Sequence, residues 1–190
     1  LPGIAAGVNA VLGTDHTRET IRPYVGPPLH DSFATLTGRD DVDAIVAEYR
    51  RVYAEIMVDG TTVFDGIEAA LQALADDGTV LAVATSKAKP LADALLDGLG
   101  LAHFFAAVAG PVPPARDDKT ATIADALAQL GRPTDDVTMV GDRHHDIDGA
   151  RAHGIRAIGV TWGFGTREEL AGADALIDAP AELLARVASG

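Results

Sequence analysis

The feature that most constrains the fold of this chain is a regular alternation of short apolar runs with helical segments from about residue 65 onward. Each run is apolar along its whole length, which is typical of strands buried on both faces. The expected strands are 80–84, 104–109, 137–140, 157–160 and 175–177. Strands of this kind with helices between them indicate a parallel sheet covered on both sides. The sequence therefore predicts a doubly wound α/β fold.

The first sixty residues have a different pattern, without a convincing strand. Apolar residues recur at helical spacing over 4–12 and 42–57, which predicts two amphipathic helices. Between them lies a loop centred on Gly26-Pro27-Pro28, where two prolines forbid a regular helix. We therefore expect a helical cap domain over residues 1–64 and an α/β core domain over 65–190.

Amino-acid composition and net charge exclude several classes of binding partner and of binding site. Apolar residues make up 47% of the 190 residues, as in folded proteins, and the formal net charge is −13. Such a surface repels nucleic acid and anionic lipid, so neither is an expected partner. The chain has no cysteine, which excludes disulfides and thiolate metal sites. No apolar run approaches the ~20 residues that span a bilayer, and a signal peptide is not recognisable, so a cytoplasmic protein is expected.

Polar side chains follow the first and third expected strands, where open parallel sheets bind ligands. Asp142 and Asp146 come after the third strand, with Gly141 allowing a close turn there. Two carboxylates without histidine or cysteine suit Mg²⁺, which usually adds waters and a substrate phosphate. The alternative is that Asp142 is a turn residue and Asp146 a helix N-cap. His144 and His145 are expected to face solvent or to contact a metal-binding residue, rather than to bind a metal themselves.

Two further residues complete a site for a phosphoryl group. The Thr85 hydroxyl and the backbone N–H groups after it can donate to an anionic oxygen, although a local bond to the backbone is the commoner use of such a threonine. Lys119 can place an ammonium in the same site, or it can be a surface lysine beside Asp117 and Asp118. Together a hydroxyl, a cation and two carboxylates suit phosphoryl transfer.

At this point the residues resemble a known family. Residues 80–86, Lys119, and 137–142 with Asp146 are similar to the second, third and fourth motifs of the haloacid dehalogenase superfamily. Residues 24–33 resemble a stretch of the cap in its phosphoglycolate phosphatase-like members, and residues 161–170 resemble their C-terminal loop and helix. The resemblance implies a Rossmann-like core with an inserted helical cap, and Mg²⁺-dependent hydrolysis of a small phosphomonoester such as phosphoglycolate.

The resemblance also implies a role for each matching residue. Thr85 and Ser86 would hold phosphoryl oxygens, and Lys119 would offset the charge of nucleophile and phosphate. Asp142 would bind Mg²⁺, with Asp146 as its partner. The cap segment would close over the leaving group and exclude water; its residues are Gly26, Pro27, Pro28 and Leu29.

The family's first strand ends in Asp-x-Asp-x-Thr, and this motif does not occur near Leu1. In the family its first Asp forms an aspartyl-phosphate and its second is the general acid and base. We expect this central strand upstream of residue 1, and residues 1–190 alone to be inactive. Without it the sheet would contain a slot roughly 10 Å wide, because neighbouring strands lie about 4.8 Å apart.

Other functions remain open at this stage. A phosphosugar mutase of the same superfamily would share these residues. A receiver-like phosphoacceptor is disfavoured, because its metal-binding acids precede the Thr and Lys, whereas Asp142 follows Thr85 and Lys119. A non-catalytic binding domain would fit if the Asp-x-Asp motif were absent. A small phosphorylated metabolite is the expected partner, and the protein is expected to be a monomer or homodimer.

Overall fold

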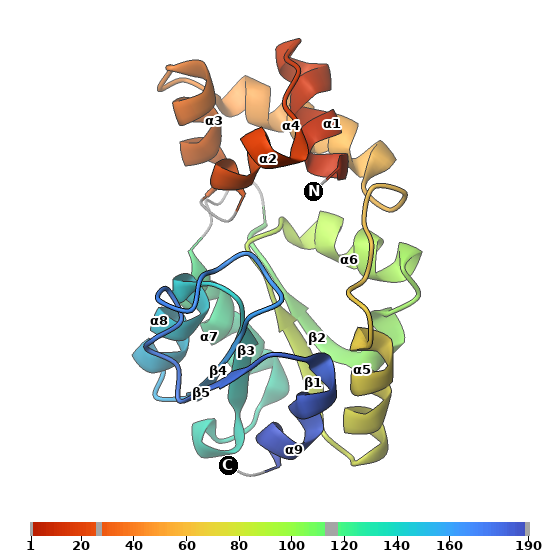
Figure 1. The fold of residues 1–190 in the computed structure, drawn as a ribbon, viewed down its shortest axis with the longest axis vertical. Coiled ribbons are helices and arrows are strands. Elements are labelled where there is room, and N and C mark those ends of the chain that lie inside the picture. The colour runs from red at the N-terminus through yellow and green to blue at the C-terminus, as the bar shows by residue number, and fades with distance from the viewer. Residues whose placement is uncertain (1, 26–27, 113–117, 189–190) are drawn as a thin grey trace.

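The chain forms a helical part stacked on an α/β part (Figure 1). The structure is a computed structural model that describes residues 2–25, 28–112 and 118–188. The helical part contains α1 (Pro2–Leu12), α2 (Arg18–Ile21), the 3₁₀ helix η1 (Arg22–Tyr24), α3 (Leu29–Thr37) and α4 (Asp43–Ile56). The sequence pattern did not indicate α3, which begins directly after Pro28 and ends at Thr37, where Gly38 with a φ of 67° caps it.

The helical part has its own buried core. Tyr49 of α4 lies between Phe33 of α3 and Tyr53, with ring centroids 5.3 and 5.4 Å apart. Its ring also meets α1, since a Cβ added to Gly7 would lie 3.0 Å from Tyr49 Cε2. Aromatic packing therefore joins three helices around one centre.

The two ends of the helical part touch each other. A Cβ on Gly60 would lie 2.6 Å from Cα of Gly3, so the contact requires glycine. In Figure 1 the N-terminal end lies on the side that faces the α/β part. Both ends thus come together, as expected for a cap; we propose that it ends near residue 64.

The α/β part follows the alternation that the sequence predicts, and its fold class is confirmed. Its elements are α5 (Ile67–Asp76), β1 (Leu81–Ala84), α6 (Lys89–Gly98), η2 (Ala102–Phe104), β2 (Phe105–Ala109), α7 (Lys119–Leu130), η3 (Thr134–Asp136), β3 (Thr138–Gly141), α8 (His144–Ala152), β4 (Arg156–Val160), β5 (Ala175–Ile177), η4 (Pro180–Glu182) and α9 (Leu183–Val187). All strand pairs are parallel. Among the described residues no helix is long and apolar enough to cross a membrane.

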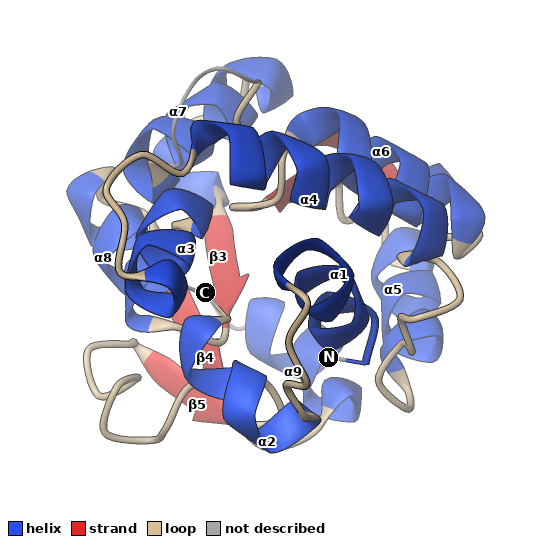
Figure 2. Ribbon diagram, turned by 90° about the horizontal axis from the view of Figure 1, so that it is seen from above, coloured by secondary structure: helices blue, strands red, loops and turns tan. Residues whose placement is uncertain are grey.

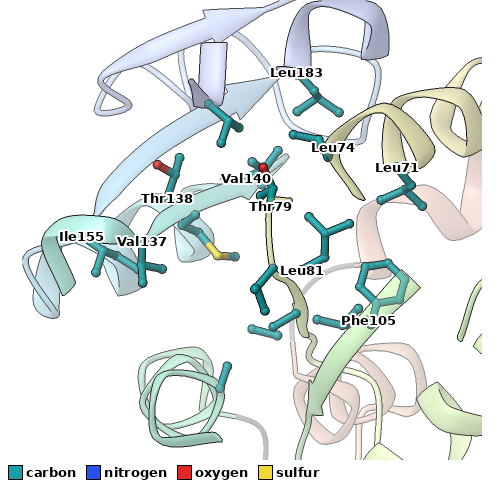
Figure 3. Close-up of a pocket in the computed structure, with 18 of the residues that line it drawn as sticks. Leu71, Leu74, Thr79, Leu81, Phe105, Val137, Thr138, Val140, Ile155 and Leu183 are labelled. Atoms are coloured by element: carbon teal, nitrogen blue, oxygen red, sulfur yellow. The ribbon is translucent and has the colours of Figure 1, made fainter. Parts of the chain in front are cut away.

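Within the residues that the structure describes, the strands form two sheets rather than one continuous sheet. Strand β1 pairs with β2, and β3, β4 and β5 form the second sheet in that order. A groove of about 840 Å³ lies between the facing edges of β1 and β3, where the sequence predicts a slot (Figure 3). Apolar side chains line it from both sheets, and Val80 and Val140 are 45% and 36% exposed.

Helices hold the two sheets together across this groove. On one face, Leu74 of α5 and Leu183 of α9 pack with Ile158 of β4 and partly cover Leu81 of β1. On the other face, α7 packs against both β1 and α8. The carboxyl ends of β1 and β3 therefore remain side by side although their edges are unpaired in the described part of the chain.

The helical part lies over the α/β part through α4. Seen from above in Figure 2, α4 lies over the side of the molecule that contains α6, and Leu91 and Leu95 of α6 pack against the buried core of the helical part. The helical part is thereby held close to α6 and to the strands on either side of it.

Candidate active site

Thr85 directly follows β1 and has a local hydrogen bond. Its backbone N–H donates to the carbonyl of Ala109 at 3.0 Å, extending the pairing with β2. Its Oγ1 accepts the backbone N–H of Lys87 at 3.1 Å, which is the local bond considered as the alternative. Among the described residues no acceptor takes the hydroxyl hydrogen, so the hydroxyl can still donate to an anion. Ser86 is exposed on the same loop.

Lys119 is the first residue of α7 and lies inside the molecule rather than on its surface. Asp118 caps this helix by accepting the N–H of Ala121 at 3.2 Å. The Lys119 ammonium lies 2.6 Å from the carbonyl oxygen of Ala84 and 2.8 Å from Oδ1 of Asp146. The Lys119 and Asp146 side chains are only 14% and 9% exposed. The geometry is therefore not that of a surface lysine beside two acids.

Asp146 lies in the first turn of α8 and uses both carboxylate oxygens. Oδ2 accepts the backbone N–H groups of Asp142 at 3.1 Å and Arg143 at 3.0 Å, while Oδ1 meets the Lys119 ammonium. Gly141 makes this possible, because a Cβ there would lie 2.2 Å from Cβ of Asp146. These bonds place Asp146 to orient Lys119 and the β3–α8 turn, and they leave it less free than Asp142 to bind a cation.

Asp142 directly follows β3 and is held by a loop that sequence reasoning gave no role in the site. Its Oδ2 accepts the N–H of Phe164 at 2.7 Å, and its carbonyl accepts the N–H of Gly165 at 3.0 Å. A Cβ on Gly163 would lie 2.3 Å from Cβ of Asp142. The available signal was the repeated glycine in Gly163-Phe164-Gly165, which permits such close approach.

The fit of Mg²⁺ depends on oxygen donors at this turn. Oδ1 of Asp142 has no described hydrogen-bond partner, and Asp146 is its neighbour through the backbone. Mg²⁺ is usually bound through one or two carboxylates plus waters and phosphate, so this donor set fits it. Among the described residues no group of three or more His, Cys, Asp or Glu could hold a metal ion.

Arg143 connects the Asp142 turn to the cap. Its Nε donates to Oε1 of Glu169 at 2.7 Å, and its Nη1 donates to the carbonyl of Val25 at 2.8 Å. His144 Nδ1 lies 2.6 Å from the same Glu169 oxygen. Partial burial would raise the pKa of Glu169, but the hydrogen bonds from Arg143 and His144 outweigh burial and hold it at about 2.

The cap segment is described only at its flanks, because Gly26 and Pro27 lie outside the described residues. Pro28 precedes α3, and Leu29 is half-buried against the core of the helical part. Ser32 Oγ donates to the carbonyl of Tyr24 at 2.9 Å, which ties α3 to the residues before the segment. Together with the Arg143–Val25 bond, these contacts hold the flanks of the segment beside the turn that contains Asp142.

The structure thus brings four of the expected site residues into one connected cluster. Ala84 ends β1 and Thr85 follows it. Lys119 links Ala84 to Asp146, and Asp146 is bonded to the backbone of Asp142. The cluster combines donors, one ammonium and two carboxylates at the open end of the groove. Such an arrangement can bind and polarise a phosphoryl group.

Known proteins provide an independent comparison. The family model for haloacid dehalogenase-like hydrolases matches residues 4–160. Tyrosine-protein kinase PtkA of Mycobacterium tuberculosis (strain ATCC 25618 / H37Rv) is 39% identical over 142 residues, covering 74% of this chain and 49% of the kinase. A phosphoglycolate phosphatase of Pectobacterium atrosepticum is 33% identical over 135 residues, covering 70% of this chain and 58% of that enzyme. This chain thus spans about half the length of these curated relatives.

A solved structure agrees over almost the whole chain. The crystal structure described as a predicted phosphatase from Clostridium acetobutylicum superposes with a TM-score of 0.89 and 32% identity, over 99% of this chain and 91% of that one. The family resemblance inferred from the motifs is therefore confirmed. The chain belongs to the haloacid dehalogenase-like hydrolase family.

Proposed function

We propose that this protein hydrolyses small phosphomonoesters with the help of Mg²⁺. The observation that carries the proposal is the position of the Lys119 ammonium. It lies 2.6 Å from the carbonyl oxygen of Ala84, at the end of β1, and 2.8 Å from Oδ1 of Asp146. A fixed cation at the carboxyl ends of two parallel strands suits a phosphoryl dianion. The names of the related phosphatases support the same reaction class.

Each residue of the cluster receives a role in this proposal. The Thr85 hydroxyl and the donors at Ser86 bind phosphoryl oxygens, and Lys119 offsets their charge. Asp142 is the principal carboxylate for Mg²⁺, which when bound neutralises phosphoryl charge as a Lewis acid. Asp146 orients Lys119 and can approach the cation only if its present hydrogen bonds rearrange.

The nucleophile belongs, in this proposal, to an Asp-x-Asp segment outside residues 1–190. The groove between β1 and β3 supports this, because an added strand parallel to both edges would end beside Lys119. Its first Asp would form a bond to phosphorus as the ester P–O bond breaks, and its second Asp would protonate the departing alkoxide. Water would then attack the acyl phosphate, the second Asp taking its proton, which releases phosphate and restores the first carboxylate.

The cap supplies the proposed substrate selection. Residues 26–29 would close over the leaving group, which favours a small ester of the phosphoglycolate type. We propose the cytoplasm as the compartment and leave a monomer and a homodimer as alternatives. A phosphosugar mutase stays possible because the same cluster serves both reactions. Because one relative is named a tyrosine-protein kinase, transfer of a phosphoryl group to a protein tyrosine is a further candidate reaction.

One experiment separates these functions. The protein expressed from its complete coding sequence should release phosphate from 2-phosphoglycolate and from phenyl phosphate with Mg²⁺, and excess EDTA should abolish release. Conversion of glucose 1-phosphate to glucose 6-phosphate without release would indicate a mutase instead. Transfer of label from ATP to tyrosine without ester hydrolysis would indicate a kinase. Absence of all three activities would refute an enzymatic role and favour a binding domain.

A further inference from the structure

Lys87 crosses from the α/β part to the cap next to the proposed phosphoryl site. Its ammonium lies 3.2 Å from the hydroxyl oxygen of Tyr53 on α4 and 4.3 Å from the centre of that ring. Tyr53 is only 4% exposed, and Lys87 is half-buried. The contact therefore lies inside the boundary between cap and core.

The other two lysines of the chain each form an ion pair with a carboxylate, and Lys87 does not do so among the described residues. Lys89 pairs with Asp93 at 2.8 Å, and Lys119 pairs with Asp146 at 2.8 Å. Within the described ranges no carboxylate pairs with Lys87, and Tyr53 is a neutral partner. A partly buried ammonium without a counter-charge is costly, so an anion bound there would be favoured.

A second cation lies on α4, the helix that carries Tyr53. Arg50 precedes Tyr53 by three residues, which places the two side chains on one face of α4. Its Nε is buried and has no hydrogen-bond partner among the described residues. Burial lowers the pKa of Arg50 from its ordinary value. A buried donor of this kind is satisfied at little cost by an incoming anionic oxygen.

Lys87 also connects the proposed phosphoryl site with the helical part. The Lys87 backbone N–H donates to Oγ1 of Thr85, so its side chain starts at the phosphoryl site and ends at the cap. A substrate whose phosphoryl group binds at Thr85 would extend its leaving group in the direction of the cap.

We propose that Lys87, with Arg50 and the Tyr53 hydroxyl, binds a second anionic group carried on the leaving group of the substrate. The substrate class is then phosphate esters that also carry a carboxylate or a second phosphate, in preference to esters with a neutral leaving group. This inference rests on the proposed phosphatase function and refines its substrate.

The test compares esters with and without a second anionic group, using protein expressed from the complete coding sequence. 2-Phosphoglycolate is paired with its neutral amide, and ethylene glycol bisphosphate with ethyl phosphate. We expect kcat/KM of the unaltered protein to favour the charged member of at least one pair by tenfold or more. Which pair shows the larger ratio identifies the second group as a carboxylate or a phosphate.

Variants assign the preference to the proposed residues. Lys87→Met should reduce the ratio to below threefold, mainly through KM of the charged ester, and Lys87→Arg should retain most of it. Arg50→Gln should reduce it partly. Lys89→Met is the matched control and should leave the ratio unchanged, because Lys89 is paired with Asp93.

The outcomes distinguish failure of the anionic subsite from failure of the proposed phosphatase function. Hydrolysis without any charge preference in the unaltered protein, or a preference that survives in Lys87→Met, would overturn the anionic subsite while leaving phosphatase function standing. Absence of hydrolysis of every ester would overturn the proposed function and this inference with it. Circular dichroism of each variant verifies folding, and the unaltered protein gives a decisive ratio even if one variant does not fold.

Discussion

Replacing Lys119 with Met tests whether the ion pair at the strand ends is a structural and chemical centre. The substitution keeps an unbranched side chain and removes the ammonium. It leaves the Asp146 carboxylate, 9% exposed, without its cation at 2.8 Å, and it leaves the Ala84 carbonyl without the donor at 2.6 Å. The loss is therefore that of a nearly buried charged partner.

The expected cost follows from what remains around Asp146. Removing one partner of a buried ion pair typically costs about 3–5 kcal/mol. Asp146 keeps the backbone N–H groups of Asp142 and Arg143, both on Oδ2, so we expect the lower end, about 3 kcal/mol of unfolding free energy. The surface pair Lys89–Asp93 has side chains 36% and 42% exposed, so Lys89→Met should cost about 0.5 kcal/mol or less.

A double-mutant cycle of the parent, Lys119→Met, Asp146→Asn and the double variant isolates the pair itself. In the Lys119→Met background, Asp146→Asn removes the uncompensated charge, while the amide oxygen can still accept both backbone N–H groups. We therefore expect the double variant to be more stable than Lys119→Met alone by about 1–2 kcal/mol. Urea unfolding followed by circular dichroism measures each free energy of unfolding, with Lys89→Met as the control.

Activity supplies the second readout of the same substitution. If Lys119 offsets phosphoryl charge, kcat of the complete protein should fall by about 10²–10³-fold, as for loss of a preorganised donor. A free-energy loss below about 1 kcal/mol, a double variant no more stable than the single one, and a less than threefold fall in kcat would together refute the reasoning.

The remaining predictions concern the turn after β3 and the loop that supports it. Asp142→Asn should abolish Mg²⁺-stimulated phosphate release while changing the melting temperature by only a few degrees, since an amide oxygen can still accept the Phe164 N–H; unchanged turnover would exclude Asp142 as a ligand. Gly163→Ala should reduce kcat at least tenfold, because the added Cβ would lie 2.3 Å from Cβ of Asp142; an alanine variant with normal kinetics would contradict this contact. The hydrogen bonds that hold the pKa of Glu169 at about 2, despite burial, should contribute stability above about pH 4.5 that is lost as the pH falls toward 2. Urea unfolding of Glu169→Gln and of the parent between pH 2.5 and 6 measures this contribution. If the free energy of unfolding changed with pH equally in both proteins, the contribution would be absent.

Much of the α/β part could be predicted because its signals are local. Buried parallel strands are continuous apolar runs, so 80–84 and 137–140 were recognisable, and observed β1 and β3 begin one residue later than expected. The C-terminal end of α7 was also readable from Gly131, whose φ is 59°. Elements whose residues specify their own conformation are therefore visible without tertiary information.

Features that depend on distant contacts were not predictable in the same way. Helix α3 follows a proline-rich loop, and burial of Phe33 against Tyr49 stabilises it. The bond from Arg143 to Val25 joins residues 118 positions apart, and no sequence pattern near either residue indicates it. The ion pair between Asp146 and Lys119 also joins distant residues, so the sequence did not indicate it. Asp146 as a partner for Mg²⁺ stays a prediction.

The proposed catalytic cluster coincides with the least continuous part of the fold. The strand edges at the groove are not bonded to each other, so alignment of β1 with β3 depends on helices packed across both faces. Lys119 adds a polar bridge at one end, joining the β1 carbonyl of Ala84 to Asp146 after β3. A strand seated in the groove would hydrogen-bond to both edges and bury Val140, so it would fix the spacing of Thr85 and Asp142 as well as add stability. Occupancy of the groove and competence of the site should therefore be coupled, because the same two strand ends define both.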